Sequence, residues 1–406
     1  MTSVLNYLRS GFILFLTVLA LAVSAQPDNT IAIGERTGFN SEVLGEERFL
    51  WIHTPPGMTD NSELPVVYLL DGSAHFQSVS ALVDYMSGNA MCPPMIVVGI
   101  ENTDRGRDLS PTKVDATHPY AAGGRFDTSG GGPNFMKFVQ NELFPYIESN
   151  YPTAPYRMFI GHSLGGLTSM DALLHYTDLF NSFISIDPSM WWSDQSLLKE
   201  LEAQNKKGMF KGKSMYLGIA NTMNKGTTIA SAKEDTSFDS GHIRAIIATD
   251  EFFKAHPENE LKYGSKYYPK EDHGTVPLIT AYDAFRFIFD FYRFDRSEFD
   301  DTTLERFIAH NEIVSKSMGY DVMPSETMVN GMGYGYMQEE KFEMAESAFL
   351  LNVKNYSKSG NVYDSLGDYY SAVGKKEKAI ESFRKALDIE EAAHTREKLE
   401  GLKNPE

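Results

Sequence analysis

Cysteine is almost absent from the sequence: Cys92 is the only one among 406 residues. A lone thiol excludes an internal disulfide, a metal site built from cysteines and a dithiol redox pair. The chain also lacks a phosphate-binding glycine loop and any histidine or carboxylate pattern with the spacing of metal ligands. We therefore expect the protein to work without a metal or another cofactor.

Positive charge is scarce as well. Lys and Arg number 37 against 55 Asp and Glu, which gives a formal charge of −18 at pH 7. Proteins that bind nucleic acid neutralise its phosphates with clustered Lys and Arg. Because no such cluster occurs here, nucleic acid is excluded as an expected partner.

Long apolar runs are missing after the first 25 residues. Before that point, Arg9 precedes the short apolar run from Gly11 to Val23, and small residues follow up to Ala25. This pattern predicts a signal peptide over residues 1–25, because the run is too short to cross a bilayer comfortably. Its removal would change the charge from −18 to −19, and the protein would not span a membrane. We expect export to a bacterial periplasm or to the extracellular space.

Apolar strand patterns alternate with helical patterns over residues 26–296. The expected strands are 47–54, 64–70, 95–100, 156–160, 183–186, 215–219 and 261–268. The expected helices are 74–86, 135–151, 164–176, 243–256 and 278–292, whereas 101–133 shows no clear periodicity. Such alternation predicts an α/β domain with a doubly wound, mostly parallel sheet.

The segment 161–166, Gly-His-Ser-Leu-Gly-Gly, lies where an expected strand ends and an expected helix begins. A Gly-x-Ser-x-Gly at such a corner is typical of the nucleophile elbow of α/β-hydrolases. The turn strains the serine backbone and leaves no room for side chains at the flanking positions. We therefore predict that Ser163 is a nucleophile and that the fold is an α/β-hydrolase fold.

A nucleophilic serine needs a base and an acid that orients the base. Among the histidines after Ser163, His273 alone lies in a loop directly after an expected strand, so we predict that it is the base. For the acid, chain order allows four candidates. Asp235 is our first choice, and Glu234, Asp239 and Asp187 stay open.

Acyl transfer also needs two backbone N–H groups that bind the oxyanion. The first expected donor is Leu164, which follows the nucleophile. The second should come from the turn after an earlier strand, where Gly72 permits a close approach and Ser73 or Ala74 can donate.

Several motifs, in this order, together resemble the putative-esterase family, which includes esterase D-like, enterochelin (siderophore) and feruloyl esterases. They are Tyr68-Leu69-Leu70-Asp71-Gly72, Val98-Gly99-Ile100, Arg105-Gly106-Arg107-Asp108-Leu109-Ser110-Pro111, Gly161-His162-Ser163-Leu164-Gly165-Gly166, Asp187-Pro188-Ser189-Met190-Trp191-Trp192 and the loop that holds His273. The resemblance covers about residues 40–295. It implies serine-dependent hydrolysis of a siderophore, feruloyl or acyl ester, with His162, Arg105, Arg107, Trp191 and Trp192 at the substrate pocket. The chain departs from the family after strand 215–219, where relatives often carry the acid and this sequence has Asn221-Thr222-Met223.

After residue 296 only helical patterns remain, so we predict a small all-α domain over 297–406. Residues 302–318 form a candidate connecting helix. Gly333, Tyr336, Ala345 and Phe349 recur 34 positions later as Gly367, Tyr370, Ala379 and Phe383. That period resembles the tetratricopeptide repeat, with copies at about 327–360 and 361–394. Repeats of this kind favour a protein or peptide partner.

Two alternatives to hydrolysis stay open. An acyltransferase would use the same serine with an alcohol in place of water. A non-catalytic interaction protein would use the repeats and keep the hydrolase fold only as a scaffold, although it would have no need of His273.

Overall fold

The structure, a computed structural model, describes residues 31–56, 58, 63–114, 119–124, 126–295 and 297–403. The expected signal peptide lies outside the described residues. None of the described helices is both long and apolar enough to cross a membrane.

The described residues contain one eight-stranded sheet in the order β1-β2-β4-β3-β5-β6-β7-β8. Its strands are β1 (Glu35–Ser41), β2 (Glu46–His53), β3 (Leu64–Leu69), β4 (Ile96–Ile100), β5 (Thr153–His162), β6 (Ser182–Ile186), β7 (Ser214–Ala220) and β8 (Lys262–Tyr268). The pairs β1–β2 and β2–β4 are antiparallel, and all other pairs are parallel. The prediction of a mostly parallel, doubly wound sheet is confirmed.

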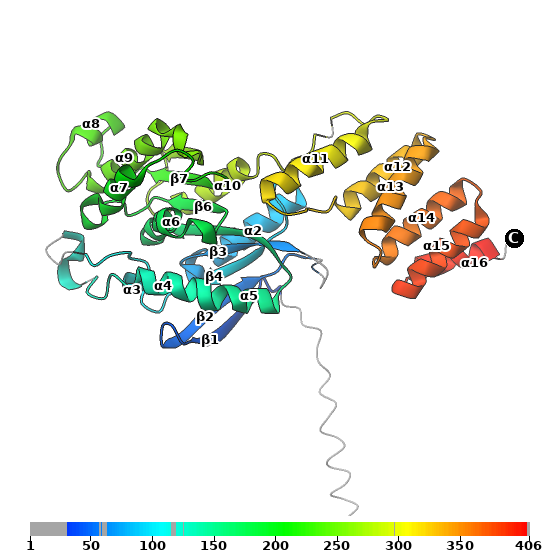
Figure 1. The fold of residues 1–406 in the computed structure, drawn as a ribbon, viewed down its shortest axis with the longest axis horizontal. Helices are drawn as coiled ribbons and strands as arrows, with labels where there is room; N and C mark the ends of the chain where they lie inside the picture. Colours follow the sequence, from blue (N-terminus) through cyan, green and yellow to red (C-terminus); the bar gives the residue numbers. More distant parts are fainter. Residues whose placement is uncertain are drawn as a thin grey trace, which may run out of the picture.

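Helices cover both faces of the sheet (Figure 1). One face packs against α2 (Gly72–Gly88) and α10 (Val276–Ile288). The opposite face packs against α4 (Gly132–Phe138), α5 (Phe144–Asn150), α6 (Leu164–His175), α7 (Trp192–Gln204) and α9 (Gly241–Ala255). The central strands β3, β4, β6 and β7 are buried along their whole length, because both faces are covered.

Several local features differ from the sequence-based expectations, and α7 and α8 (Ile229–Glu234) are helices that were not expected. β1 was not expected, because an edge strand with mostly exposed residues carries no apolar signal. The segment without periodicity holds the short helix α3 (Arg105–Asp108) and the 3₁₀ turn η1 (Pro119–Gly124). The helix expected over 135–151 is interrupted by a π turn, η2 (Val139–Leu143), between α4 and α5.

Smaller elements complete this part of the chain. They are α8 (Ile229–Glu234) and the 3₁₀ turns η3 (Thr177–Leu179) and η4 (Pro257–Asn259). α8 lies in the long connection between β7 and α9.

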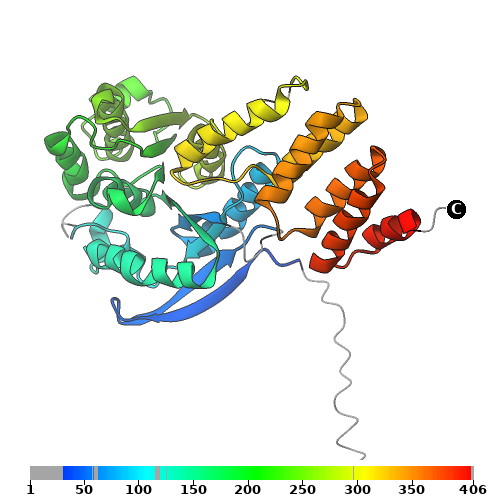
Figure 2. The same ribbon diagram turned by 45° about the vertical axis from the view of Figure 1, so that its right-hand side comes forward.

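Beyond the sheet, the chain is helical: α11 (Thr303–Met318), α12 (Glu326–Gln338), α13 (Phe342–Asn355), α14 (Gly360–Ala372), α15 (Lys376–Ile389) and α16 (Ala393–Lys403). In Figures 1 and 2, α12 to α16 stand side by side beyond α11, at the end of the molecule away from α7 and α9. α11 belongs to two cores. Phe307 packs with the following helices, whereas Val314 and Met318 pack with the core beneath α2 and α10.

The two helix pairs α12–α13 and α14–α15 cross at small residues. A Cβ at Gly333 would lie 2.7 Å from the Phe349 ring, and one at Gly367 would lie 2.5 Å from the Phe383 ring. The same Gly–Phe contact therefore closes both pairs, 34 positions apart in the sequence. The tetratricopeptide identity of these pairs stays a prediction.

Candidate active site

Ser163 lies at the corner between β5 and α6 with a positive φ of 61°, which a non-glycine residue rarely adopts. Its N–H donates to the carbonyl of Ile186 at 2.9 Å, which ties the corner to the end of the neighbouring strand β6. A side chain at Gly161 would overlap the carbonyl of Gly165. Gly161 is therefore required by the sharpness of this turn.

His273 lies in the loop between β8 and α10, and its Nε2 is 3.0 Å from Oγ of Ser163. The loop is held by Asp272, whose carboxylate accepts the N–H groups of Gly274 and Thr275 at 2.8 and 2.9 Å. The structure thus brings together the predicted nucleophile and the predicted base.

The acid that reaches His273 is Asp187, not Asp235. Oδ2 of Asp187 lies 2.5 Å from Nδ1 of His273. Asp187 directly follows β6, which pairs with β5, so its side chain emerges beside the elbow. A carboxylate only accepts, so Nδ1 of His273 must donate and Nε2 is left to accept the proton of Ser163.

Asp235 is occupied elsewhere, which corrects our first choice. Its carboxylate accepts Oγ of Ser237 at 2.7 Å and Oγ of Ser240 at 2.5 Å. Hydrogen bonds from Ser240 and Ser237 lower the pKa of this partly exposed carboxyl to about 2. Asp235 therefore fastens the turn before α9.

Asp187 is fully buried and surrounded by donors. Oδ1 accepts a hydrogen bond from the N–H of Ala220 at 3.0 Å. Oδ2 accepts one from Nε2 of His242 at 3.0 Å and one from Nδ1 of His273 at 2.5 Å. Burial alone would raise the pKa of Asp187, but the hydrogen bonds from His242 and His273 outweigh burial and hold the pKa far below its usual range. The group is a carboxylate throughout the neutral pH range.

His242 is a site residue that the sequence reading missed. It is the second residue of α9, and its ring centre lies 5.4 Å from that of His273. No motif surrounds it in the sequence. Its proximity to Asp187 depends on how the connection between β7 and α9 folds.

Asp187, His242 and His273 are also the described residues whose ligand atoms could gather around a metal ion. Tetrahedral zinc ligands stand about 3.3 Å apart, given metal–ligand bonds near 2 Å. The contacts of 2.5 and 3.0 Å at Asp187 Oδ2 are shorter than that. Their geometry fits hydrogen bonding.

Two turns offer N–H groups for an oxyanion. Leu164 begins α6, and Gly72 and Ser73 begin α2, so their N–H groups have no acceptor inside their helices. Ala74, the alternative to Ser73, already donates to the carbonyl of Asp71 at 2.9 Å. A Cβ at Gly72 would lie 2.6 Å from the backbone of Gly99, so only glycine fits.

Arg105 joins these two turns. Its guanidinium binds both carboxylate oxygens of Asp71, at 2.7 and 2.9 Å, and donates to the carbonyl of His162 at 3.2 Å. Asp71 precedes Gly72, and His162 precedes Ser163. Burial raises the pKa of Asp71, but the hydrogen bonds and charge of Arg105, together with the hydrogen bond from Asn102, outweigh burial and lower that pKa.

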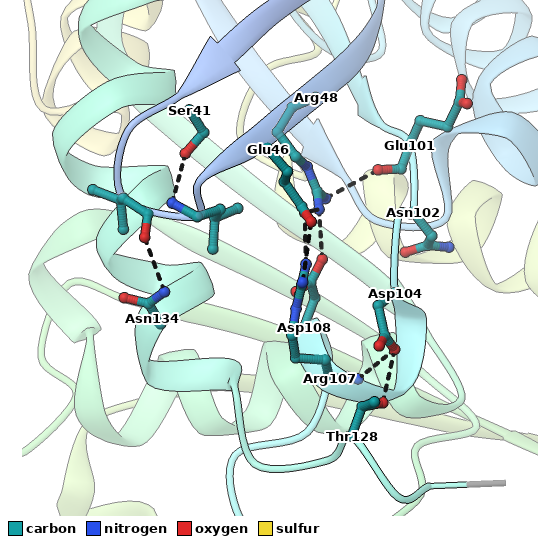
Figure 3. Close-up of polar contacts among 12 residues, drawn as sticks. Ser41, Glu46, Arg48, Glu101, Asn102, Asp104, Arg107, Asp108, Thr128 and Asn134 are labelled. Atoms are coloured by element: carbon teal, nitrogen blue, oxygen red, sulfur yellow. Dashed lines mark hydrogen bonds and ion pairs between the residues drawn. The ribbon is translucent and has the colours of Figure 1, made fainter.

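Arg107 does not share this position, although we expected it at the pocket. Its guanidinium binds Glu46 and Asp108, as Figure 3 shows. Asp108 also accepts from Arg48 at 2.6 Å, and both of these side chains are buried. This ion network anchors α3 to β2, and thereby holds the helix on which Arg105 stands.

His162 packs against His273, with its ring centre 4.5 Å from that of His273. Burial above all, and then the neighbouring His273 and His75, lower the pKa of His162 to about 4. His162 is therefore neutral at pH 7. His75, another residue that the sequence reading missed, packs edge-on against it at 5.6 Å.

The two tryptophans differ from each other. Trp191 is half-buried, whereas Trp192 is 1% exposed and donates from Nε1 to the carbonyl of Thr112. Trp192 is therefore part of the core, and its expected place at the pocket mouth is corrected.

Comparisons with known proteins agree with this geometry. The family model described as "Putative esterase" matches residues 41–256, which is more than half of the chain. The protein YbbA of Bacillus subtilis is 32% identical over 37% of this chain and 60% of its own length, and the ferri-bacillibactin esterase BesA of the same species is 30% identical over 38% and 57%. The chain thus spans three fifths or less of the curated relatives it matches.

A solved structure is also similar. The IroE-like serine hydrolase from Shewanella oneidensis matches with a TM-score of 0.66 and 28% identity over 79% of this chain and 98% of that one. Since the family model covers more than half of the chain, from β2 through β7 and with Ser163 and Asp187 inside the match, this chain belongs to the putative-esterase family.

Proposed function

We propose that the protein is an exported serine esterase that hydrolyses a carboxylic ester with Ser163, His273 and Asp187. The observation that carries this proposal is the chain of two hydrogen bonds, 3.0 Å from Ser163 Oγ to His273 Nε2 and 2.5 Å from His273 Nδ1 to Asp187. A serine, histidine and carboxylate in this order are the parts that acyl transfer through a covalent intermediate requires.

In the acylation step, Nε2 of His273 takes the proton of Ser163 while Oγ attacks the ester carbonyl carbon. The carbonyl oxygen becomes negative and is stabilised by the N–H groups of Leu164 and of Gly72 or Ser73. The imidazolium of His273 then gives its proton to the leaving alcohol, and an acyl group stays on Ser163. Asp187 stabilises the positive ring throughout.

Deacylation repeats these roles with water. His273 removes a proton from the water as its oxygen attacks the acyl carbon, and the proton then goes to Oγ of Ser163 as the carboxylic acid leaves. Every proton is accounted for by His273.

A siderophore ester is the substrate class that we propose first. The relative BesA is named a ferri-bacillibactin esterase, and the solved relative is described as IroE-like. Feruloyl and short acyl esters are the other classes that the sequence resemblance implies.

We also propose that the helical part after residue 296 is a separate tetratricopeptide-like unit that binds a protein or peptide. Its support is the repeated Gly–Phe contact in the two helix pairs. α11 lies in both cores, so it would join that unit to the esterase part.

The test is turnover of a p-nitrophenyl ester by the wild type and by Ser163→Ala, with Ser189→Ala as a control serine near the elbow. We expect turnover to vanish in Ser163→Ala alone. Equal rates for wild type and Ser163→Ala would refute the proposed function. A panel of siderophore, feruloyl and short acyl esters then identifies the substrate class from kcat/KM.

A further inference from the structure

The acid of the triad is held by a second histidine. Oδ2 of Asp187 lies 3.0 Å from Nε2 of His242 and 2.5 Å from Nδ1 of His273, so one oxygen accepts from two imidazoles. The His242 side chain is 13% exposed and that of Asp187 is fully buried. A buried contact of this kind is stronger than the same contact in water.

Asp187 stands in an uncommon backbone conformation, with φ of 41°. A non-glycine residue in this region costs about 1–3 kcal/mol and keeps the conformation only when its surroundings enforce it. The backbone is tied by the N–H of Asp187, which donates to the carbonyl of Gly218 at 2.8 Å. The side chain is tied at Oδ1 by Ala220 and at Oδ2 by His242.

These two side-chain contacts fix the plane of the carboxylate without any help from His273. Ala220 holds one oxygen and His242 holds the other, so the carboxylate cannot rotate about its last bond. His273 therefore meets an acceptor that is already oriented. Orientation of this kind matters because a displacement of about 1 Å in a catalytic group can cost 100-fold in rate.

The end of β7 shows why the carboxylate of Asp187 needs the contact with His242. The side chain of Asn221 is engaged elsewhere, with Nδ2 donating to the carbonyl of Pro269 at 3.1 Å and Oδ1 accepting the N–H of Met223 at 3.3 Å. β7 thus supplies a backbone donor from Ala220, and the acid comes from β6. His242 comes from α9 and contacts Oδ2, the carboxylate oxygen of Asp187 that Ala220 does not bind.

We propose that His242 is a positioning residue for the esterase reaction, acting through Asp187 to orient His273. This inference rests on the proposed function. The turn before α9 supports it, because Asp235 accepts from Ser237 and Ser240 and so fastens the chain two residues before His242.

The test compares His242→Ala and His242→Gln with the wild type. Gln offers an Nε2 donor at a similar reach, and Ala offers none. We expect His242→Ala to lower kcat about 10- to 100-fold with KM changed less than about threefold, and His242→Gln to recover most of the loss. His256→Ala is the matched control, because His256 caps the other end of α9 and contacts Asn205 and Glu258 instead.

A second measurement separates positioning from folding. The reaction of Ser163 with a fluorophosphonate is measured in an Asp187→Asn background. If His242 acts only through Asp187, its removal should have little further effect once Asp187 is already replaced. Adding His242→Ala should then lower the rate of phosphonylation less than about twofold. A full additional loss in that background would overturn the inference. Wild-type kcat in His242→Ala, or equal damage in the Gln and Ala variants, would overturn it too.

If His242→Ala does not fold, kcat of His242→Gln is compared with kcat of His242→Asn instead. Asn keeps the amide but is too short to reach Asp187, so it should lose activity where Gln keeps it. Failure of this inference is distinct from failure of the proposed function. The first leaves turnover dependent on Ser163, and the second removes that dependence.

Discussion

The carboxylate of Asp187 lies 2.5 Å from Nδ1 of His273, although the two residues are 86 positions apart in the chain. If this contact orients the base, Asp187→Asn should lower kcat by about 10³- to 10⁴-fold, because the amide favours the wrong tautomer of the imidazole. Steady-state kinetics on a p-nitrophenyl ester measure this.

Asp235→Asn is the control for that prediction. Its side chain accepts from Ser237 and Ser240 and holds only the turn before α9, so kcat should change less than about threefold. The reverse ranking of the two variants would show that Asp187 is not the acid.

Arg105 should be sensitive to the shape of its cation as well as to the charge. Lys keeps the charge but cannot bind both oxygens of Asp71 and the carbonyl of His162 with one planar group. We expect Arg105→Lys to lower kcat about tenfold, because the two turns with the oxyanion donors lose their common anchor. Arg107→Lys should instead lower the melting temperature and leave kcat within about twofold. Equal kcat for Arg105→Lys and wild type would contradict the anchor role.

Replacement by alanine should change the stability of the helical part in opposite directions at two helical glycines. A Cβ at Gly367 would lie 2.5 Å from the Phe383 ring, so Gly367→Ala should destabilise the helical part by about 1–3 kcal/mol. Gly331 in α12 has no neighbour within 4 Å of that position, so Gly331→Ala should stabilise it by about 0.5–1 kcal/mol. Hydrogen exchange in α12–α15 measures both. Equal protection in the two variants would argue against the close crossing of α14 and α15.

His175 should make stability depend on pH in a definite direction. Its ring contacts Asp171 at 2.8 Å and Glu200 at 3.0 Å, and these contacts, the one with Asp171 first, raise its pKa to about 9. In the unfolded chain a histidine titrates near about 6.5. The stabilisation is therefore complete below about pH 6.5 and is lost as pH rises through about 9.

Urea unfolding of the wild type and His175→Gln at pH 6 and pH 10 checks this. The difference in unfolding free energy should be larger at pH 6 and should shrink in high salt, which screens partly exposed pairs. A difference that stays constant between the two pH values would mean that His175 is not charged through these contacts.

Much of the fold was predictable because its signals are local. Buried parallel strands are apolar along their length, so β3, β4, β6 and β7 could be recognised from composition. An edge strand such as β1 has one or no covered face, and its mostly polar residues carry no such signal. The π turn within 139–143 has no sequence signature either, since both flanking helices continue the same apolar stripe.

The α/β alternation, the elbow at Ser163 and the position of His273 in a loop after a strand were all predictable from the sequence. Each of these depends on residues that are neighbours in the chain: glycines around a strained serine, and a histidine in the loop after a strand. Which carboxylate meets His273, by contrast, depends on long-range packing. Asp187 reaches His273 because β6 pairs with β5, whereas the connection that holds Asp235 folds back on its own serines. His242 and Arg105 take their positions for the same reason, because long-range packing sets which polar groups meet at the end of the sheet.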